Sequence, residues 1–270
     1  MKTSTPPVER LAAGLREQTA ALAAAVDGAD PAGRVPTCPE WTITDLVVHV
    51  GAAHRWTRDL VEARAAGPES LVPPATDVEP ADWASWLNEG ADRMAEAGVR
   101  EAGTEVWTFL GPRPAAFWVR RMLHDTAVHH ADAALALGRP FALADDLAAD
   151  ALGEGLELLA WPGAQQARPA LAGLRGDGQT LRLQPRDGDG WLITRTPEGI
   201  AWERDGGGPA VQEGDVVLGR RPAAGLHAQD PAGGPARPGE GRRGTARPLA
   251  RAHRVLSQGT PKRRRDSIPG

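Results

Sequence analysis

The spacing of apolar residues predicts five helices in the first 160 residues of the chain. Leucine and valine recur at helical intervals between 8 and 26, among alanines that favour helix. Comparable spacing predicts helices over 43–66, 81–98, 115–137 and 144–160. Thr42 and Asp45 have the spacing of a capping box at the start of the second helix. Gly138 and Pro140 are placed to end the fourth.

After residue 180 the pattern changes from helical spacing to alternation. Short runs at 181–184, 191–194 and 200–203 predict strands, with a turn at 188–190. We therefore predict a mainly α protein, in which a helical bundle over residues 5–139 is followed by a small, incomplete α+β domain over residues 140–205. Beyond Gly206 the hydrophobic pattern dissolves.

Residues 206–270 differ from the rest of the chain in charge and composition. They hold twelve basic and five acidic residues, a net charge of +7, whereas residues 1–205 carry −11. With thirteen glycines, eight prolines and no aromatic residue, the segment buries too little apolar surface to offset its ordering entropy. We expect a disordered tail or the product of an altered reading frame. Its basic run Arg263–Arg265 favours unspecific binding of polyanions, so no specific nucleic-acid partner is expected.

Several classes of protein are excluded by composition. No run of eighteen apolar residues occurs, so we expect neither a membrane helix nor a membrane partner. Cys38 is the single cysteine, which excludes an intramolecular disulfide and a cysteine-only zinc site. We expect it to be a small buried residue and the nine tryptophans to pack in and around the core. Residues 1–10 do not resemble a secretory signal, so a cytoplasmic location is expected.

Five of the seven histidines fall on the second and fourth predicted helices, at positions 49, 54, 124, 129 and 130. Asp125 and His129 are one turn apart on one face of the fourth helix, and His49 lies on the apolar stripe of the second. Two nitrogens and one oxygen with an open fourth position are typical of a catalytic zinc site, and bundle cores can hold such sites. The alternative is that these are hydrogen-bonded core histidines, and spacing alone leaves it open.

Two arginines, Arg120 and Arg121, precede the histidine cluster on the fourth helix. A solvated helix face is the favoured interpretation, and binding of an anionic substrate is the alternative.

Several segments resemble the actinobacterial family of mycothiol-dependent maleylpyruvate isomerases. They are Val35-Pro36-Thr37-Cys38-Pro39-Glu40-Trp41-Thr42, Asp45 to Val50, His54-Arg55-Trp56, Val106 to Phe109, Gly111 to Pro114, Phe117-Trp118 and His124 to His130. The resemblance covers roughly residues 8–205 and implies a DinB-like four-helix bundle. It places the three metal ligands of the family on His49, Asp125 and His129, although the family usually has Glu where Asp125 stands.

The resemblance implies a thiol-dependent enzyme whose cofactors are a divalent metal, Zn²⁺, and mycothiol. In such an enzyme the metal would lower the pKa of the mycothiol thiol, and the thiolate would attack an electron-poor double bond in a small, maleylpyruvate-like substrate. Departure of the thiolate gives an isomerase, and its retention gives a transferase. Arg121 is the cation expected to orient an anionic substrate. The alternative is a non-catalytic metal- or ligand-binding bundle with a degenerate second domain. We expect a monomer or homodimer.

Overall fold

The computed structural model describes residues 5–67, 77–185, 189–206 and 216–218. The chain divides into two compact units, Ser4–Glu154 and the residues from Gly155 on. Helix α5 (Asp145–Ala160) runs across this division. The domain boundary expected from the sequence, between residues 139 and 140, is not tested by this grouping and stays a prediction.

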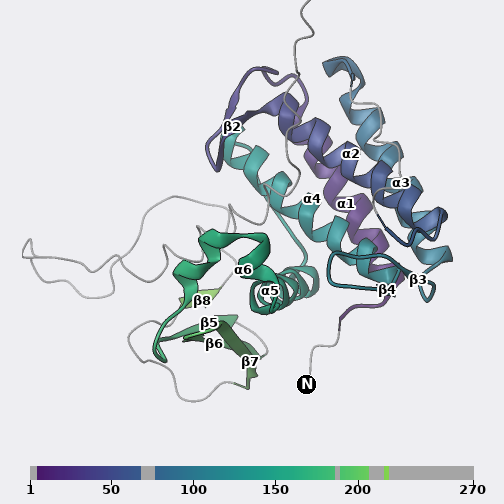
Figure 1. The fold of residues 1–270 in the computed structure, drawn as a ribbon. Helices are drawn as coiled ribbons and strands as arrows, with labels where there is room; N and C mark the ends of the chain where they lie inside the picture. The colour runs from purple at the N-terminus through teal and green to yellow at the C-terminus, as the bar shows by residue number, and fades with distance from the viewer. Residues whose placement is uncertain (1–4, 68–76, 186–188, 207–215, 219–270) are drawn as a thin grey trace, which may run out of the picture. The chain divides into compact units, whose positions relative to one another are not determined.

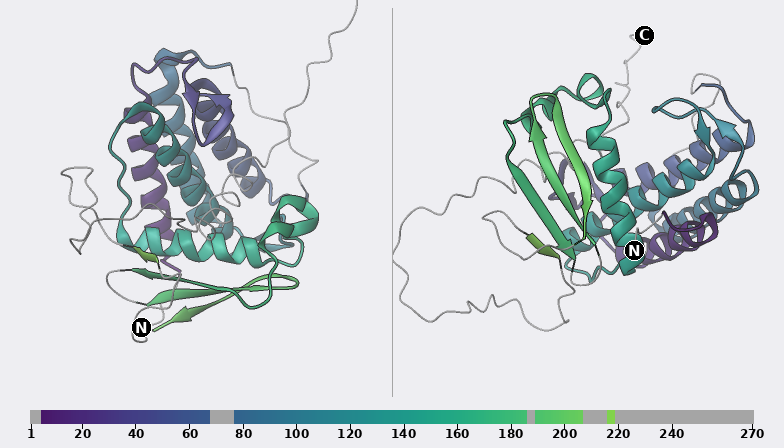
Figure 2. Two further views of the ribbon diagram at one scale, coloured as in Figure 1. Left: turned by 90° about the vertical axis from the view of Figure 1, so that its left-hand side faces the viewer. Right: turned by 90° about the horizontal axis from the view of Figure 1, so that it is seen from below.

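Four long helices form the first unit: α1 (Val8–Val26), α2 (Ile43–Glu62), α3 (Trp83–Arg100) and α4 (Ala116–Leu137). Helix α1 packs mainly against α4 and α3, and α2 packs mainly against α3 and α4. Views at right angles show the four lying side by side (Figures 1 and 2). Their apolar faces enclose two clusters of buried side chains, one around Leu15 and Leu123 and one around Leu46 and Leu87. The predicted mainly α fold with a four-helix bundle is confirmed.

The ends of the helices agree with the sequence pattern to within two residues, except at the end of α2. The capping box is confirmed, because the Asp45 amide donates to Thr42 Oγ1 over 3.2 Å and the Thr42 amide donates to the Asp45 carboxylate over 3.0 Å. Helix α4 ends at Gly138, in the left-handed conformation, as predicted. Helix α2 ends at Glu62 rather than at 66, because Arg64 has a φ of 46° and turns the chain out of the helix.

A short hairpin precedes α2 where the sequence predicted a loop. Strand β1 (Arg34–Val35) pairs antiparallel with β2 (Cys38–Thr42), and β2 leads directly into α2. Cys38 is buried, as predicted. A second ladder joins β3 (Glu105–Val106) to β4 (Arg113–Pro114), and the 3₁₀ turn η2 (Pro80–Asp82) precedes α3. The first hairpin matters for the site because it fixes Trp41 beside the start of α2.

The second unit contains α6 (Ala164–Ala167), the 3₁₀ segment η3 (Pro169–Leu174) and a sheet in the order β7-β6-β5-β8. Strands β5 (Thr180–Pro185), β6 (Gly190–Thr196) and β7 (Gly199–Asp205) form an antiparallel meander (Figure 2). These are the three predicted strands. Strand β8 (Val216–Leu218) pairs parallel with β5, at a position where the sequence predicted no strand. The rest of the segment expected to be disordered or frame-altered, 207–215 and 219–270, lies outside the described residues.

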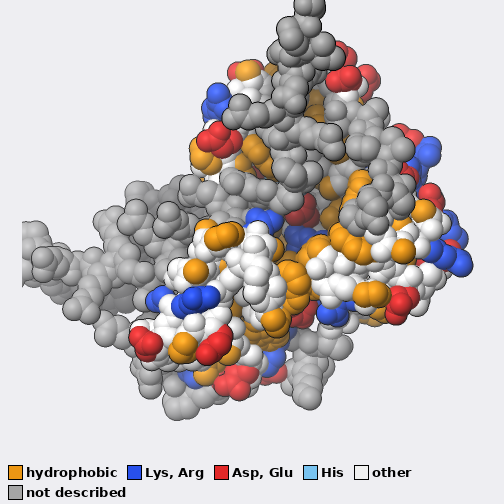
Figure 3. Space-filling model, viewed as in Figure 1, with side chains coloured by type: hydrophobic (Ala, Val, Ile, Leu, Met, Phe, Trp, Pro, Cys, Tyr) orange, Lys and Arg blue, Asp and Glu red, His pale blue; other side chains and the backbone are white. Residues whose placement is uncertain are grey.

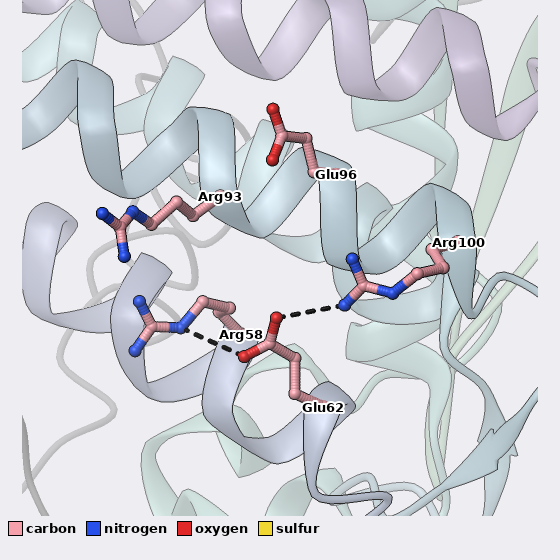
Figure 4. A pocket seen from close by; sticks show the side chains of 5 residues that line it. All are labelled: Arg58, Glu62, Arg93, Glu96 and Arg100. Carbon is pink, nitrogen blue, oxygen red and sulfur yellow. Dashed lines mark hydrogen bonds and ion pairs between the residues drawn. The ribbon is translucent and has the colours of Figure 1, made fainter.

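The outer surface of α2 and α3 carries interspersed acidic and basic side chains. The space-filling view shows both kinds over the side where α3 lies (Figure 3). Between the two helices a groove of about 450 Å³ is lined by Arg58, Glu62, Arg93, Glu96 and Arg100. Glu62 pairs there with Arg58 at 3.7 Å and with Arg100 at 3.1 Å (Figure 4). In the described part of the chain no helix is both long and apolar enough to cross a membrane.

Candidate metal centre

Three side chains from two helices converge inside the first unit. His49 comes from the early part of α2, and Asp125 and His129 lie one turn apart on α4. His49 Nε2 is 3.3 Å from Asp125 Oδ2, and His129 Nε2 is 3.9 Å from the same oxygen. One ligand atom from each residue lies within 4.8 Å of the other two. The structure thus brings together the three residues that the sequence predicted as a set.

The donor atoms suit a divalent metal in type and in spacing. Two atoms bound to tetrahedral zinc at about 2.0–2.2 Å lie about 3.4 Å apart, close to the distance between His49 and Asp125. His129 is fully buried, and its Nε2 has no hydrogen-bond partner among the described residues. An orphaned nitrogen in a protein interior is costly, and a metal ion at this point would supply its missing partner.

A second carboxylate fixes the orientation of the His129 ring. Asp132, one turn further along α4 and also buried, lies with Oδ2 3.0 Å from His129 Nδ1. An ionised carboxylate only accepts hydrogen bonds, so Nδ1 of a neutral ring carries the hydrogen and Nε2 keeps its lone pair. This tautomer is the one that a metal ligand requires, and a carboxylate behind the histidine is the usual means of setting it.

An aromatic ring covers the two imidazoles. Trp41, at the end of β2, has its ring centroid 4.9 Å from that of His49 and 5.4 Å from that of His129. The two imidazoles are themselves 4.8 Å apart, edge to face. The hairpin therefore holds an apolar wall against one side of the centre, which limits the access of water.

Asp125 also takes part in a buried ion-pair network. Arg121, one turn earlier on α4, donates to Asp125 Oδ1 over 2.9 Å, and its other terminal nitrogen donates to Glu154 of α5. Burial alone would raise the pKa of Asp125, but the hydrogen bond from His49 and the charge of Arg121 outweigh burial and hold that pKa well below the ordinary value. Burial opposes the charged form of Arg121, yet Glu154 and Asp125 outweigh it and raise the pKa of Arg121.

The expectation that Arg120 and Arg121 form a solvated helix face is wrong. Their side chains are only 14% and 16% exposed, and both pair with carboxylates of α5. Arg120 pairs with Asp150 at 2.9 Å, and Arg121 pairs with Glu154. The sequence pattern did not reveal this, since it gives no sign of which face of α4 the fifth helix covers.

The remaining histidines of the two helices have protein partners. The distances are 2.8 Å from His54 Nε2 to Thr126 Oγ1, 2.8 Å from His124 Nε2 to Asp150 Oδ2, and 2.9 Å from His130 Nδ1 to Gln18 Oε1. These three are hydrogen-bonded core residues, as the alternative interpretation expected of histidines on these helices. His54 and His124 each also have one buried ring nitrogen, Nδ1, without a hydrogen-bond partner among the described residues. His129 differs from them in that its unpartnered Nε2 lies close to two further potential ligands, His49 and Asp125.

Three residues around the centre were not predicted to take part in it. Asp132 was detectable, because it stands three residues after His129 on a helix. Trp41 appeared only as part of a sequence motif, since the hairpin that positions it was not predicted. Glu154 gave no signal, because its role depends on how α5 packs on α4.

Together these features define a four-helix bundle with a candidate metal centre built from two of its helices. Residues 12–134 match the model of the mycothiol maleylpyruvate isomerase N-terminal domain. This match agrees with the resemblance found in the sequence. All three candidate ligands lie within the matched range.

One solved structure was found to be similar to the chain. It is a crystal structure of a histidine-to-alanine mutant of the mycothiol-dependent maleylpyruvate isomerase, with 15% sequence identity. The similarity covers 81% of this chain and 87% of that one, with a TM-score of 0.49. No curated protein matches the chain.

Proposed function

We propose that the protein is a metal-dependent enzyme that uses mycothiol to act on a small electrophilic substrate, as an isomerase or a thiol transferase. The observation that carries the proposal is the convergence of His49, Asp125 and His129, in which the buried Nε2 of His129 has no hydrogen-bond partner among the described residues. The match of residues 12–134 to the mycothiol maleylpyruvate isomerase domain supports the thiol and a maleylpyruvate-like substrate.

The acidic groups beside the imidazoles also favour a cation. Asp125 Oδ2 lies 3.3 Å from His49 Nε2, and Asp132 Oδ2 lies 3.0 Å from His129 Nδ1. Carboxylate oxygens and imidazole nitrogens are common ligands of zinc, and a carboxylate behind a ligand histidine is a common supporting group.

In this proposal each side chain has a separate task. His49, Asp125 and His129 hold the metal, which we take to be Zn²⁺, and leave a position open for the cosubstrate. The bound metal would lower the pKa of the mycothiol thiol, so that the nucleophilic thiolate is present at neutral pH. Asp132 keeps the proton of His129 on Nδ1, and Trp41 shields the imidazoles from water.

Some parts of the sequence-based expectation are retained as proposals. The contact between Arg121 and an anionic substrate remains a prediction. The guanidinium of Arg121 already donates to two carboxylates, so a substrate would have to share it with them. We also retain the cytoplasmic location suggested by the single cysteine, together with a monomeric or homodimeric state.

Metal analysis of the purified protein tests the proposal directly. We expect about one divalent ion per chain, a severe loss in His49→Ala and in His129→Ala, and no loss in His130→Ala. His130 is the matched control, because it is a buried histidine of the same helix with a partner on α1. Calorimetry should then detect mycothiol binding that depends on the metal.

The outcomes separate the candidate functions. Wild-type protein without metal, or alanine variants with unchanged metal content, would show that the proposed centre does not exist. Metal binding by the three residues without metal-dependent binding of mycothiol would instead support the alternative, a non-catalytic metal-binding bundle.

A further inference from the structure

The two oxygens of the Asp125 carboxylate have different neighbours. Oδ2 faces the imidazoles of His49 and His129, at 3.3 Å and 3.9 Å. Oδ1 points the other way and accepts a hydrogen bond from Arg121 over 2.9 Å. One oxygen of the candidate ligand is therefore taken up by the protein, and the other is available to a metal.

Arg121 is held in turn by a residue of another helix. Its second terminal nitrogen donates to Glu154 of α5, whose side chain is only 3% exposed. The guanidinium is planar and carries its donors in a fixed fork, so contacts at both terminal nitrogens define its position better than one contact does. A continuous chain of ionic contacts thus runs from α5 through Arg121 to the outer oxygen of Asp125.

We propose that Arg121 and Glu154 are positioning residues that hold Asp125 as a ligand through Oδ2 alone. This inference rests on the proposed function, because it assumes that Asp125 binds the metal. A free carboxylate can turn about its side-chain bond and bind a cation through both oxygens. With Oδ1 held by Arg121, only Oδ2 remains, and a position around the metal is kept open for the thiol.

Arg121 and Glu154 carry opposite charges, so both can be replaced at once without changing the net charge of the protein. Replacement of Arg121 alone would change two things, because it releases Asp125 and also removes a positive charge near the metal. The double variant Arg121→Met/Glu154→Gln replaces a neutral pair by neutral residues of similar length. A change in metal affinity in this variant therefore reports the positioning of Asp125 rather than a change of net charge. The variant also leaves no new unpaired charge on α5.

A matched control is present one residue away. Arg120 and Asp150 form an ion pair between the same two helices, and both side chains are largely buried. The control variant Arg120→Met/Asp150→Asn removes that pair without touching Asp125. Any general loosening of α5 from α4 should appear in both double variants.

The readouts are the affinity of the full-length protein for Zn²⁺, measured by competition with a chelator, and the visible absorption spectrum of the Co²⁺-loaded protein. We expect Arg121→Met/Glu154→Gln to bind zinc roughly 10–100-fold more weakly than wild type, as is typical when the partner of a metal ligand is removed. We also expect a changed cobalt spectrum, because the coordination of Asp125 changes. The control should keep the wild-type spectrum and an affinity within about threefold.

Each result is decisive. Wild-type affinity and an unchanged cobalt spectrum in Arg121→Met/Glu154→Gln would overturn the inference while leaving the proposed function intact. Equal losses in both double variants would overturn it too, because they would assign the effect to helix packing. If wild type itself binds no metal, the proposed function fails and the inference fails with it. The single variant Glu154→Gln, which keeps Arg121, should fold like wild type and show a smaller loss than the double variant.

Discussion

Two histidines on α2, five residues apart, show how the environment decides the chemistry of one residue type. His49 remains partly exposed beside Asp125, whereas His54 is 1% exposed and bonded to Thr126. Burial lowers the pKa of His54 to about 3. The charge of Asp125 opposes this shift, and Arg55 and His49 add to it. His54 is therefore neutral at physiological pH and belongs to the core.

The low pKa of His54 predicts a loss of stability in mild acid. The unfolded chain binds a proton at this histidine as the pH falls through about 6.5, whereas the folded protein does so only near 3. Between these values acidification favours unfolding. From pH 7 to pH 5 this contribution lowers the free energy of unfolding by about 2 kcal/mol. Urea unfolding of wild type and of His54→Gln at both pH values measures it.

Glutamine at position 54 keeps a hydrogen-bonding group for Thr126 and does not titrate. Other titrating groups contribute equally to both proteins, so the difference between their pH dependences isolates His54. Identical pH dependences would show that the histidine is not held neutral.

At the scale of the elements, glycine allows α3 and α4 to approach closely. A β-carbon added at Gly98 would lie 2.2 Å from Cγ2 of Val119, which is fully buried on α4. We therefore expect Gly98→Ala to lower the free energy of unfolding by about 1–3 kcal/mol, the usual cost of overpacking a core. Chemical denaturation measures the change.

Gly155→Ala is the control for Gly98→Ala. Gly155 is also helical, but a β-carbon at this position meets no atom of the described residues within 4 Å. Alanine should there leave stability unchanged or raise it by up to about 1 kcal/mol, because it favours helix. If Gly98→Ala is as stable as Gly155→Ala, the close contact between α3 and α4 is not as described.

The elements that were predicted well are those whose formation depends on residues close together in the sequence. The helices of the bundle follow from apolar spacing, and their ends follow from the cap at Thr42 and from Gly138. The candidate ligands also depend on helical spacing, which places Asp125 and His129 on one face. The hairpin of β1 and β2 and the contact of Arg121 with Glu154 were missed, because both depend on pairing between separate segments. A two-residue strand such as β1 has no periodicity to detect.

At the scale of the whole molecule, the candidate centre is contained in one unit of the chain. His49, Asp125 and His129, with Trp41, Asp132, Arg121 and Glu154 around them, all lie in the unit Ser4–Glu154. The family match, residues 12–134, includes the three candidate ligands and ends before Glu154. Metal binding should thus be a property of the unit Ser4–Glu154. The segment 206–270 differs from residues 1–205 in that its net charge is positive rather than negative.

Removal of residues 219–270 tests this separation. The deletion leaves every described strand and helix in the chain, including β8, and it keeps all three candidate ligands. We expect the shortened protein to keep its metal stoichiometry and to bind zinc with an affinity within about threefold of the full chain, a change below about 0.7 kcal/mol. Because the deleted residues include much of the basic charge, binding of polyanions should weaken and lose its dependence on salt. A large loss of metal would instead mean that the deleted segment contributes to the centre, and the assignment of the site to α2 and α4 alone would be wrong.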